Sequence, residues 1–159
     1  MTAYQDFLVS NPFKPLRLVV LSLALLQPAA SFADQLPRVE LRTGMFRISA
    51  EVAADYTNRA TGLMNRSVMP SHEGMIFVYP EKAIHCMWMK NTLIPLSVAF
   101  LDDNGVVINV EEMLPQTEDN HCAKAPARFA LEMNAGWFRS KNIGSGAVIK
   151  GIEKLPAAE

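Results

Sequence analysis

The sequence carries almost no excess charge of either sign. Its 159 residues include 15 basic and 16 acidic side chains, which gives a formal net charge of -1. A protein that binds nucleic acid through the phosphates needs a basic surplus, so we expect no nucleic-acid partner. Disorder of the whole chain is excluded too, because 50% of the residues are hydrophobic. Disordered chains combine low hydrophobicity with high net charge.

The sequence also has few long hydrophobic runs. The apolar run Leu18–Leu26 follows the basic residues Lys14 and Arg17 and ends well before the small residue Ala33. Nine residues are roughly half of the ~20 that a membrane-spanning helix needs. This order of basic, apolar and small residues is typical of a secretory signal peptide. We therefore predict that residues 1–33 are a cleaved signal peptide and that the mature protein is periplasmic or secreted.

Tracts that would divide the mature chain are absent as well. Residues 34–159 contain no long glycine, serine or proline tract, no internal repeat and no low-complexity segment. A chain of this length can bury roughly two-thirds of its unfolded surface in one core. We expect one compact domain, with no stable membrane span after cleavage.

Strand patterns dominate the mature chain. Apolar and polar residues alternate with period 2 over Met45–Val52, and Arg38–Arg42 is expected to pair with this strand. Further strands are expected over 75–79, 83–89, 96–101, 106–110 and 128–133, with a short one around Val148. A short helix is expected over 55–66, with Thr57 as a possible cap, and a helical turn over 136–141. Asn104-Gly105 indicates a hairpin turn. The pattern predicts an α+β fold, a mainly antiparallel β-barrel or sandwich with one or two short helices.

Four short blocks of the sequence are distinctive. They are Arg59-x-x-Gly62-Leu63-Met64-x-Arg66, Gly74-Met75-Ile76-Phe77, Trp88-Met89-Lys90-Asn91-Thr92-x-Ile94-Pro95-Leu96 and Leu131-Glu132-x-x-Ala135-Gly136. In this order and over most of the mature chain, they resemble domain-of-unknown-function family 192, an uncharacterised family of often exported bacterial and archaeal proteins. The resemblance implies a single compact, strand-rich domain. It implies no reaction.

The third block also predicts a ligand site. Lys90, Asn91 and Thr92 follow an apolar strand and precede Pro95, so three polar side chains occupy a strand end. An ammonium, an amide and a hydroxyl near arginines can form a pocket for a carboxylate, a phosphate or a sugar. The predicted ligand is an unknown small molecule or an envelope protein, and the candidate binding residues are Arg59, Arg66, Lys90, Asn91, Thr92 and Glu132.

The same residues have a purely structural interpretation. Asn91 and Thr92 are residue types that often satisfy backbone groups in turns. Lys90 or Arg66 would then form an ion pair with Glu132. Both interpretations stay open at the level of sequence.

Only two cysteines are present, and an even number in an exported chain favours one disulfide, Cys86–Cys122. Alternatively, thiolate, thioether and imidazole groups together suit Cu(I). On an extended strand, His85, Met87 and Met89 share one face and Cys86 lies on the other, so a copper site uses either that trio or the cysteines. Methionines on a strand face also pack in ordinary cores. A cysteine nucleophile is a weaker hypothesis, because the neighbouring histidine points to the opposite face.

Signatures of the common enzyme classes are missing. The sequence has no phosphate loop, no dinucleotide fingerprint, no Gly-x-Ser-x-Gly elbow and no His-Glu-x-x-His helix. The acidic pairs at 102–103 and 111–112 lie in a turn and on a strand, where they cannot flank one substrate. We therefore favour an exported binding or accessory module with a polar, cationic ligand site, without a cofactor, over an enzyme. A periplasmic copper-handling protein is the alternative.

Overall fold

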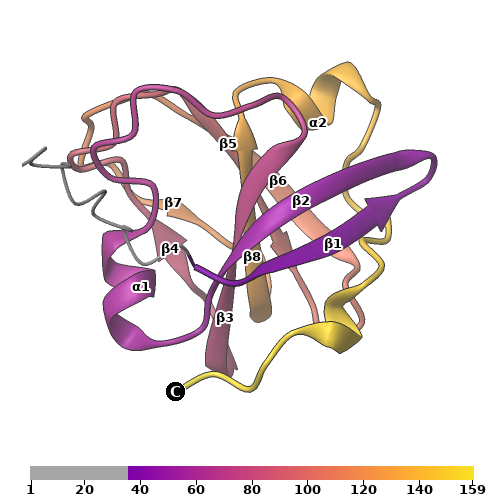
Figure 1. Ribbon diagram of the computed structural model, residues 1–159. Helices are drawn as coiled ribbons and strands as arrows, with labels where there is room; N and C mark the ends of the chain where they lie inside the picture. Colours follow the sequence, from indigo (N-terminus) through magenta and orange to yellow (C-terminus); the bar gives the residue numbers. More distant parts are fainter. Residues whose placement is uncertain (1–35) are drawn as a thin grey trace, which may run out of the picture. The chain divides into compact units, whose positions relative to one another are not determined.

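A six-stranded sheet organises the part of the chain that the structure describes (Figure 1). The structure is a computed structural model and describes residues 36–159, so the predicted signal peptide lies outside the described residues. The strand order is β1-β2-β3-β8-β5-β6. The strands are β1 (Arg38–Thr43), β2 (Phe46–Ala53), β3 (Glu73–Ala83), β5 (Leu96–Leu101), β6 (Val107–Met113) and β8 (Ala127–Asn134).

Four of the five neighbouring strand pairs are antiparallel, and β2–β3 is the parallel pair. Together with two short helices, this sheet confirms the α+β class. The predicted pairing of the first two strands is also confirmed, with Arg38 opposite Glu51. The hairpin turn at Asn104-Gly105 joins β5 to β6, and the Asp102 amide there donates to the Val106 carbonyl at 3.0 Å.

The sheet is open, so the barrel alternative is wrong and the sandwich-like arrangement is correct. The segment 146–151 bridges both edges of the sheet, through the pairs Arg42–Lys150 and Val106–Val148, but each is an isolated bridge. Gly146 and Gly151 on either side have φ of 87° and 98°, which is left-handed backbone that interrupts a strand. The extended stretch between them is therefore too short to close a barrel.

Both faces of the six-stranded sheet are covered, so the described residues form two hydrophobic cores, one on each face. On one face, the core includes Ile48, Ile76, Leu131, Trp137 and Phe138. On the other face, it includes Leu63, Met75, Phe77, Met89, Leu96 and Phe100. Because neighbouring residues of a strand point to opposite faces, β8 contributes Leu131 to the first core and Ala130 to the second.

Helix α1 (Tyr56–Thr61) is shorter than predicted. Its N-cap is Asp55, whose carboxylate accepts from the Asn58 amide at 2.8 Å, so Thr57 lies inside the helix and is not the cap. The helix ends at Gly62, where φ is 48°. Within the rest of the predicted helical segment, residues 62–65 form a turn and Arg66 has no regular secondary structure. The predicted helical turn is α2 (Trp137–Ser140), and a 3-10 turn, η1 (Ile152–Lys154), follows near the end of the chain.

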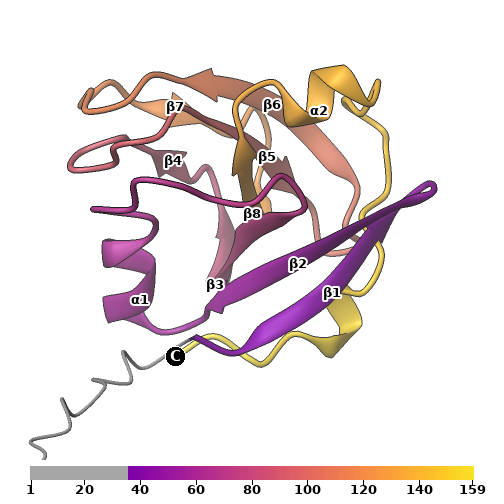
Figure 2. The same cartoon turned by 45° about the horizontal axis from the view of Figure 1, so that its top comes forward.

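A second, two-stranded sheet pairs β4 (Cys86–Met87) with β7 (His121–Cys122). Strand β4 is much shorter than the strand predicted over 83–89. Strand β3 continues past Pro80 to Ala83, so the first residue of the predicted segment belongs to β3. Figures 1 and 2 both show β4 and β7 at the same end of the described unit as α1. No helix within residues 36–159 has the length and apolar character that crossing a bilayer requires.

Candidate functional site

Glu132 lies near the centre of the six-stranded sheet. It is on β8, opposite Met75 of β3 on one side and Val98 of β5 on the other. Only 3% of the residue is exposed. Burial raises the pKa of Glu132 to about 8, and no charged or hydrogen-bonding group among the described residues opposes this shift. A carboxyl group with this environment is unusual, because buried carboxylates are normally paired.

A small pocket opens in front of Glu132. Its volume is about 30 Å³, which is room for one or two water molecules or for the terminal group of a ligand. In the described residues, every fully enclosed polar side-chain atom has a hydrogen-bond partner. The unpartnered carboxyl group of Glu132 therefore reaches into the pocket. One wall comes from α1 and the turn after it and includes Arg59, Gly62, Leu63 and Met64. The other walls include Phe77, Met87, Trp88 and Thr92.

All four sequence blocks that carry the family resemblance contribute to this pocket. The first block supplies the wall next to α1, the second supplies Phe77, the third supplies Trp88 and Thr92, and the fourth supplies Glu132. These blocks are far apart in the sequence, and the fold brings them together because β8 inserts between β3 and β5. The pocket is therefore the place where the distinctive parts of the sequence meet.

Tyr79, which the sequence analysis did not single out, borders the same region. Its hydroxyl donates to the Met87 sulfur at 3.1 Å, and its ring stacks on His85 with 3.6 Å between the ring centroids. Burial, followed by the negative charge of Glu132, raises the pKa of Tyr79. Tyr79 is therefore neutral at ordinary pH and fixes Met87, a wall of the pocket.

Arg59 lines the pocket, and its guanidinium forms hydrogen bonds with backbone carbonyl groups. Its guanidinium donates to the carbonyl oxygens of Ala54, of Val78 at 3.1 Å and of Glu159 at 2.8 Å. These bonds fix α1 against the end of the second strand and against the last residue of the chain. Arg59 thus positions the cover of the pocket with three of the five N–H donors of its guanidinium.

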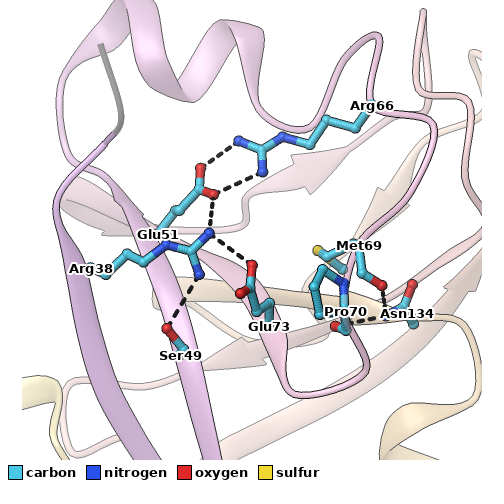
Figure 3. Close-up of polar contacts among 8 residues, drawn as sticks. All are labelled: Arg38, Ser49, Glu51, Arg66, Met69, Pro70, Glu73 and Asn134. Atoms are coloured by element: carbon cyan, nitrogen blue, oxygen red, sulfur yellow. Dashed lines mark hydrogen bonds and ion pairs between the residues drawn. The ribbon is translucent and has the colours of Figure 1, made fainter. Parts of the chain in front are cut away.

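Arg66 is paired away from the pocket, with Glu51 of β2 (Figure 3). The guanidinium binds both carboxylate oxygens, one of them at 2.8 Å. Arg38 donates to the same carboxylate at 2.7 Å and lies 2.8 Å from Glu73. Hydrogen bonding to Arg66 and the charges of both arginines lower the pKa of Glu51. The predicted ion pair of Arg66 with Glu132 does not form in the described residues.

The loop that follows Arg66 is fixed to the sheet at a second point. The side-chain amide of Asn134, at the end of β8, donates to the carbonyl oxygens of Met69 at 3.0 Å and Pro70 at 3.3 Å (Figure 3). The connection between α1 and β3 is therefore held to β2 and to β8, which keeps it over the core.

Lys90, Asn91 and Thr92 do not share one environment. Thr92 is buried and faces the Glu132 pocket, whereas Lys90 and Asn91 are exposed. The Lys90 ammonium lies 3.7 Å from the Glu118 carboxylate and 5.2 Å from the centroid of the Trp88 ring. The structure thus places Thr92 with Glu132 and Arg59, and places Lys90 with Asn91 in a neighbouring hollow.

The predicted disulfide Cys86–Cys122 is confirmed. The two cysteines are directly opposite in the β4–β7 ladder, and the bond closes a loop of 36 sequence positions. Both cysteines of the chain are in the described residues, and neither is free. The bond leaves no thiol for a nucleophile or for a thiolate metal ligand.

The alternative copper ligands are divided between two environments. His85 and Met87 both contact Tyr79, and a ring nitrogen of His85 lies 3.0 Å from the Glu81 carbonyl oxygen. Met89 is fully buried in the core that underlies the pocket. Within residues 36–159, no three histidine, cysteine or acidic side chains cluster as a metal site would require. Copper handling by His85, Met87 and Met89 stays a prediction.

Comparison with known proteins places this geometry in a family context. The sequence model of domain-of-unknown-function family 192 (DUF192), described as "Uncharacterized ACR", matches residues 39–151. A crystal structure from Sinorhizobium meliloti, named a candidate transcription regulator, is similar with 32% identity and a TM-score of 0.67, covering 72% of this chain and 92% of its own. A protein of unknown function from Novosphingobium aromaticivorans is similar with 28% identity and a TM-score of 0.69, covering 78% and 89%. No curated protein matches the chain.

Proposed function

Because the chain belongs to domain-of-unknown-function family 192, whose members are uncharacterised, we propose a function from its own pocket: an exported binding module that holds its ligand at Glu132. The N-terminal sequence pattern supports a periplasmic or secreted location, and the disulfide is the state expected in an oxidising compartment. The pocket shows no nucleophile or acid–base pair, so we favour binding over catalysis.

The observation that carries the proposal is the buried carboxyl group of Glu132, which has no partner within residues 36–159. A buried carboxyl group costs stability unless something compensates it, and proteins keep such groups mainly at functional sites. Glu51 shows that this chain can pair a buried carboxylate with arginines. At Glu132 the place of the partner is a pocket, so the missing partner is a group of the ligand.

The chemistry of the pocket selects the ligand group. An ionised Glu132 attracts a cation, and a protonated one can donate and accept a hydrogen bond. The walls at Phe77, Met87 and Trp88 are aromatic or thioether groups, which favour an alkylated cation over a strongly hydrated one. With about 30 Å³, the pocket takes the end of a molecule only. We propose that this end is a primary ammonium group on a short alkyl stem.

The name of the Sinorhizobium neighbour does not alter this proposal. A regulator that contacts DNA phosphates needs a basic surface, and this chain has a formal net charge of -1. We therefore propose a small molecule or a group of an envelope protein as the ligand.

Ethylammonium chloride is a direct probe of the pocket. The melting temperature of the oxidised protein is measured at pH 6 and pH 9 with the probe and with sodium chloride at equal concentration. Glu132 is ionised at pH 9 and mainly protonated at pH 6, so we expect ethylammonium to stabilise the protein more strongly at pH 9.

Glu132→Gln keeps the size of the side chain and removes its charge, so it should abolish the stabilisation. Glu81→Gln, at an exposed carboxylate that lines neither hollow, is the matched control and should keep it. Equal responses of the wild type and Glu132→Gln at pH 9 would refute the proposal.

A further inference from the structure

A second hollow lies beside the Glu132 pocket, on the outer side of Lys90 and Asn91. It has a volume of about 340 Å³ and is lined by Asn65, Lys90, Asn91, Leu93, Gln116 and Glu118. It is more than ten times larger than the pocket, and a volume above ~300 Å³ is in the range of small-molecule sites. The two sites share no lining residue.

Three loops meet at this hollow, and their backbones are joined directly. The Asn65 amide donates to the Asn91 carbonyl at 2.9 Å, and the Gln116 amide donates to the Thr92 carbonyl at 3.1 Å. Farther along the same loops, the Met89 amide donates to the Thr117 carbonyl at 3.0 Å. The hollow therefore has a rigid backbone frame, which holds its side chains in place without a ligand.

The three lining residues with side-chain amides all have a backbone conformation with positive φ. Asn65, Asn91 and Gln116 have φ of 60°, 57° and 60°, and apart from Asn142 they are the non-glycine residues with positive φ in residues 36–159. Asparagine tolerates this conformation, but glutamine is not favoured there. Such conformations cluster at binding sites, where the gain in function offsets their cost. Three of them around one hollow thus point to a ligand.

The polar groups of the hollow are free to bind. Among the described residues, the side-chain amides of Asn65 and Gln116 have no hydrogen-bond partner, and that of Asn91 has only a long contact of 4.0 Å to the Met64 sulfur. Lys90 and Glu118 form an exposed ion pair at 3.7 Å, which is weak enough to open. Each amide offers both donors and an acceptor, which is what a pair of neighbouring hydroxyl groups requires.

The rim of the hollow supplies apolar area. Leu93, one of the lining residues, is 43% exposed. A ligand with hydroxyl groups at its edge and carbon–hydrogen groups on its face would use both kinds of surface. We propose that this hollow binds one pyranose unit of a neutral saccharide.

A peptide ligand fits the same frame less well. Peptides that bind as an added strand need free backbone donors and acceptors at an edge. Here the backbone groups of the three loops are used by one another. The free groups are side-chain amides, which suits hydroxyl groups.

The test is a titration of the oxidised, uniformly ¹⁵N-labelled protein, followed by NMR. The probes are the neutral trisaccharides cellotriose and fully N-acetylated chitotriose, with sorbitol as an acyclic polyol control and trialanine as a peptide control. We expect saturable shifts of the Asn65, Asn91 and Gln116 side-chain amides with at least one trisaccharide. Sorbitol and trialanine should leave these signals unchanged.

Asn91→Gly and Gln116→Gly remove one amide each and retain the positive φ, so the backbone frame survives. Each should weaken trisaccharide binding at least tenfold. Asn142→Gly, at an exposed asparagine with φ of 55° after α2, is the matched control and should leave binding unchanged. The proposal is overturned if neither trisaccharide gives saturable shifts, if trialanine gives the same shifts, or if the two hollow variants bind like the control.

Discussion

Glu51 and Glu132 are two buried glutamates with opposite surroundings. They are 7% and 3% exposed, and both lie on strands of the same sheet. Glu51 is held between Arg38 and Arg66, which lower its pKa, whereas burial raises the pKa of Glu132 to about 8. The difference lies in what covers each strand. An arginine from the loop after α1 lies over Glu51, and a pocket lies over Glu132.

The comparison shows that burial alone does not define a site. Glu51 stabilises the fold because its charge is compensated inside the molecule. Glu132 can only lower the stability of the ligand-free protein, since nothing in the described residues compensates its charge. A cost of this kind is retained where a ligand removes it, which is the reason for placing the site at Glu132.

Replacing Glu132 by Gln should give the largest change in the pH dependence of stability, because it removes the uncompensated buried carboxyl group. The folded-state pKa is raised from 4.5 to about 8, so wild-type stability falls as pH rises between these values, while the unfolded carboxyl group ionises first. The full loss, which is reached above pH 8, is on the order of 5 kcal/mol, and roughly three-quarters of it falls between pH 5 and pH 8. Urea unfolding at pH 5 and pH 8 should show this decrease in the wild type and its absence in the variant. Parallel pH profiles would mean that Glu132 has an ordinary pKa.

Removing the disulfide should reduce the difference between the pKa values of Glu51 and Glu132. The double variant Cys86→Ala, Cys122→Ala loses the constraint on a loop of 36 positions, worth about 4 kcal/mol on the chain-entropy model. It also frees β4, which carries the pocket wall Met87. Water then reaches Glu132, so its pKa should fall towards 4.5 while that of Glu51 stays low. Carboxyl titration by NMR measures both values, and an unchanged Glu132 would show that β4 does not exclude water.

Glu51→Gln should have the smallest effect of the three, with the opposite pH dependence. The variant leaves Arg38 and Arg66 without their shared carboxylate. Both arginine side chains are about one-third exposed, so the loss should be about 2 kcal/mol at pH 7. Because the folded-state pKa of Glu51 is lowered, this stabilisation exists above about 4.5 and disappears as the solution is acidified. The unfolding curves of the wild type and the variant should therefore converge in acid, and a constant gap would contradict the assignment.

Much of the fold could be predicted because strand patterns are local. The alternation over β2 and the Asn104-Gly105 turn gave correct elements. The sheet order could not be predicted in this way, because it depends on where β8 inserts, and contacts that distant leave no periodic signal. The predicted helix extended too far, to residue 66, because apolar spacing continues to Met64 although the backbone turns at Gly62.

The site was predicted only in part, for a similar reason. Thr92 and Glu132 were proposed together, and they do line one pocket. Glu51 was placed on the polar side of its strand, since nothing in the sequence shows that Arg66 covers that side. Asn65 follows a helix end, where asparagine favours positive φ, so it could have been found. Gln116 could not, because glutamine carries no such preference.

The central position of β8 has a consequence for the order of folding. β8 is the last strand of the sequence, yet it joins β3 to β5. Until it arrives, the chain holds two separate pieces, β1–β2–β3 and β5–β6, each with open strand edges. Pairings this distant in sequence form late and slowly. The sheet thus cannot be completed during synthesis before Asn134 is available, so the nascent chain keeps open strand edges until its last strand has been made.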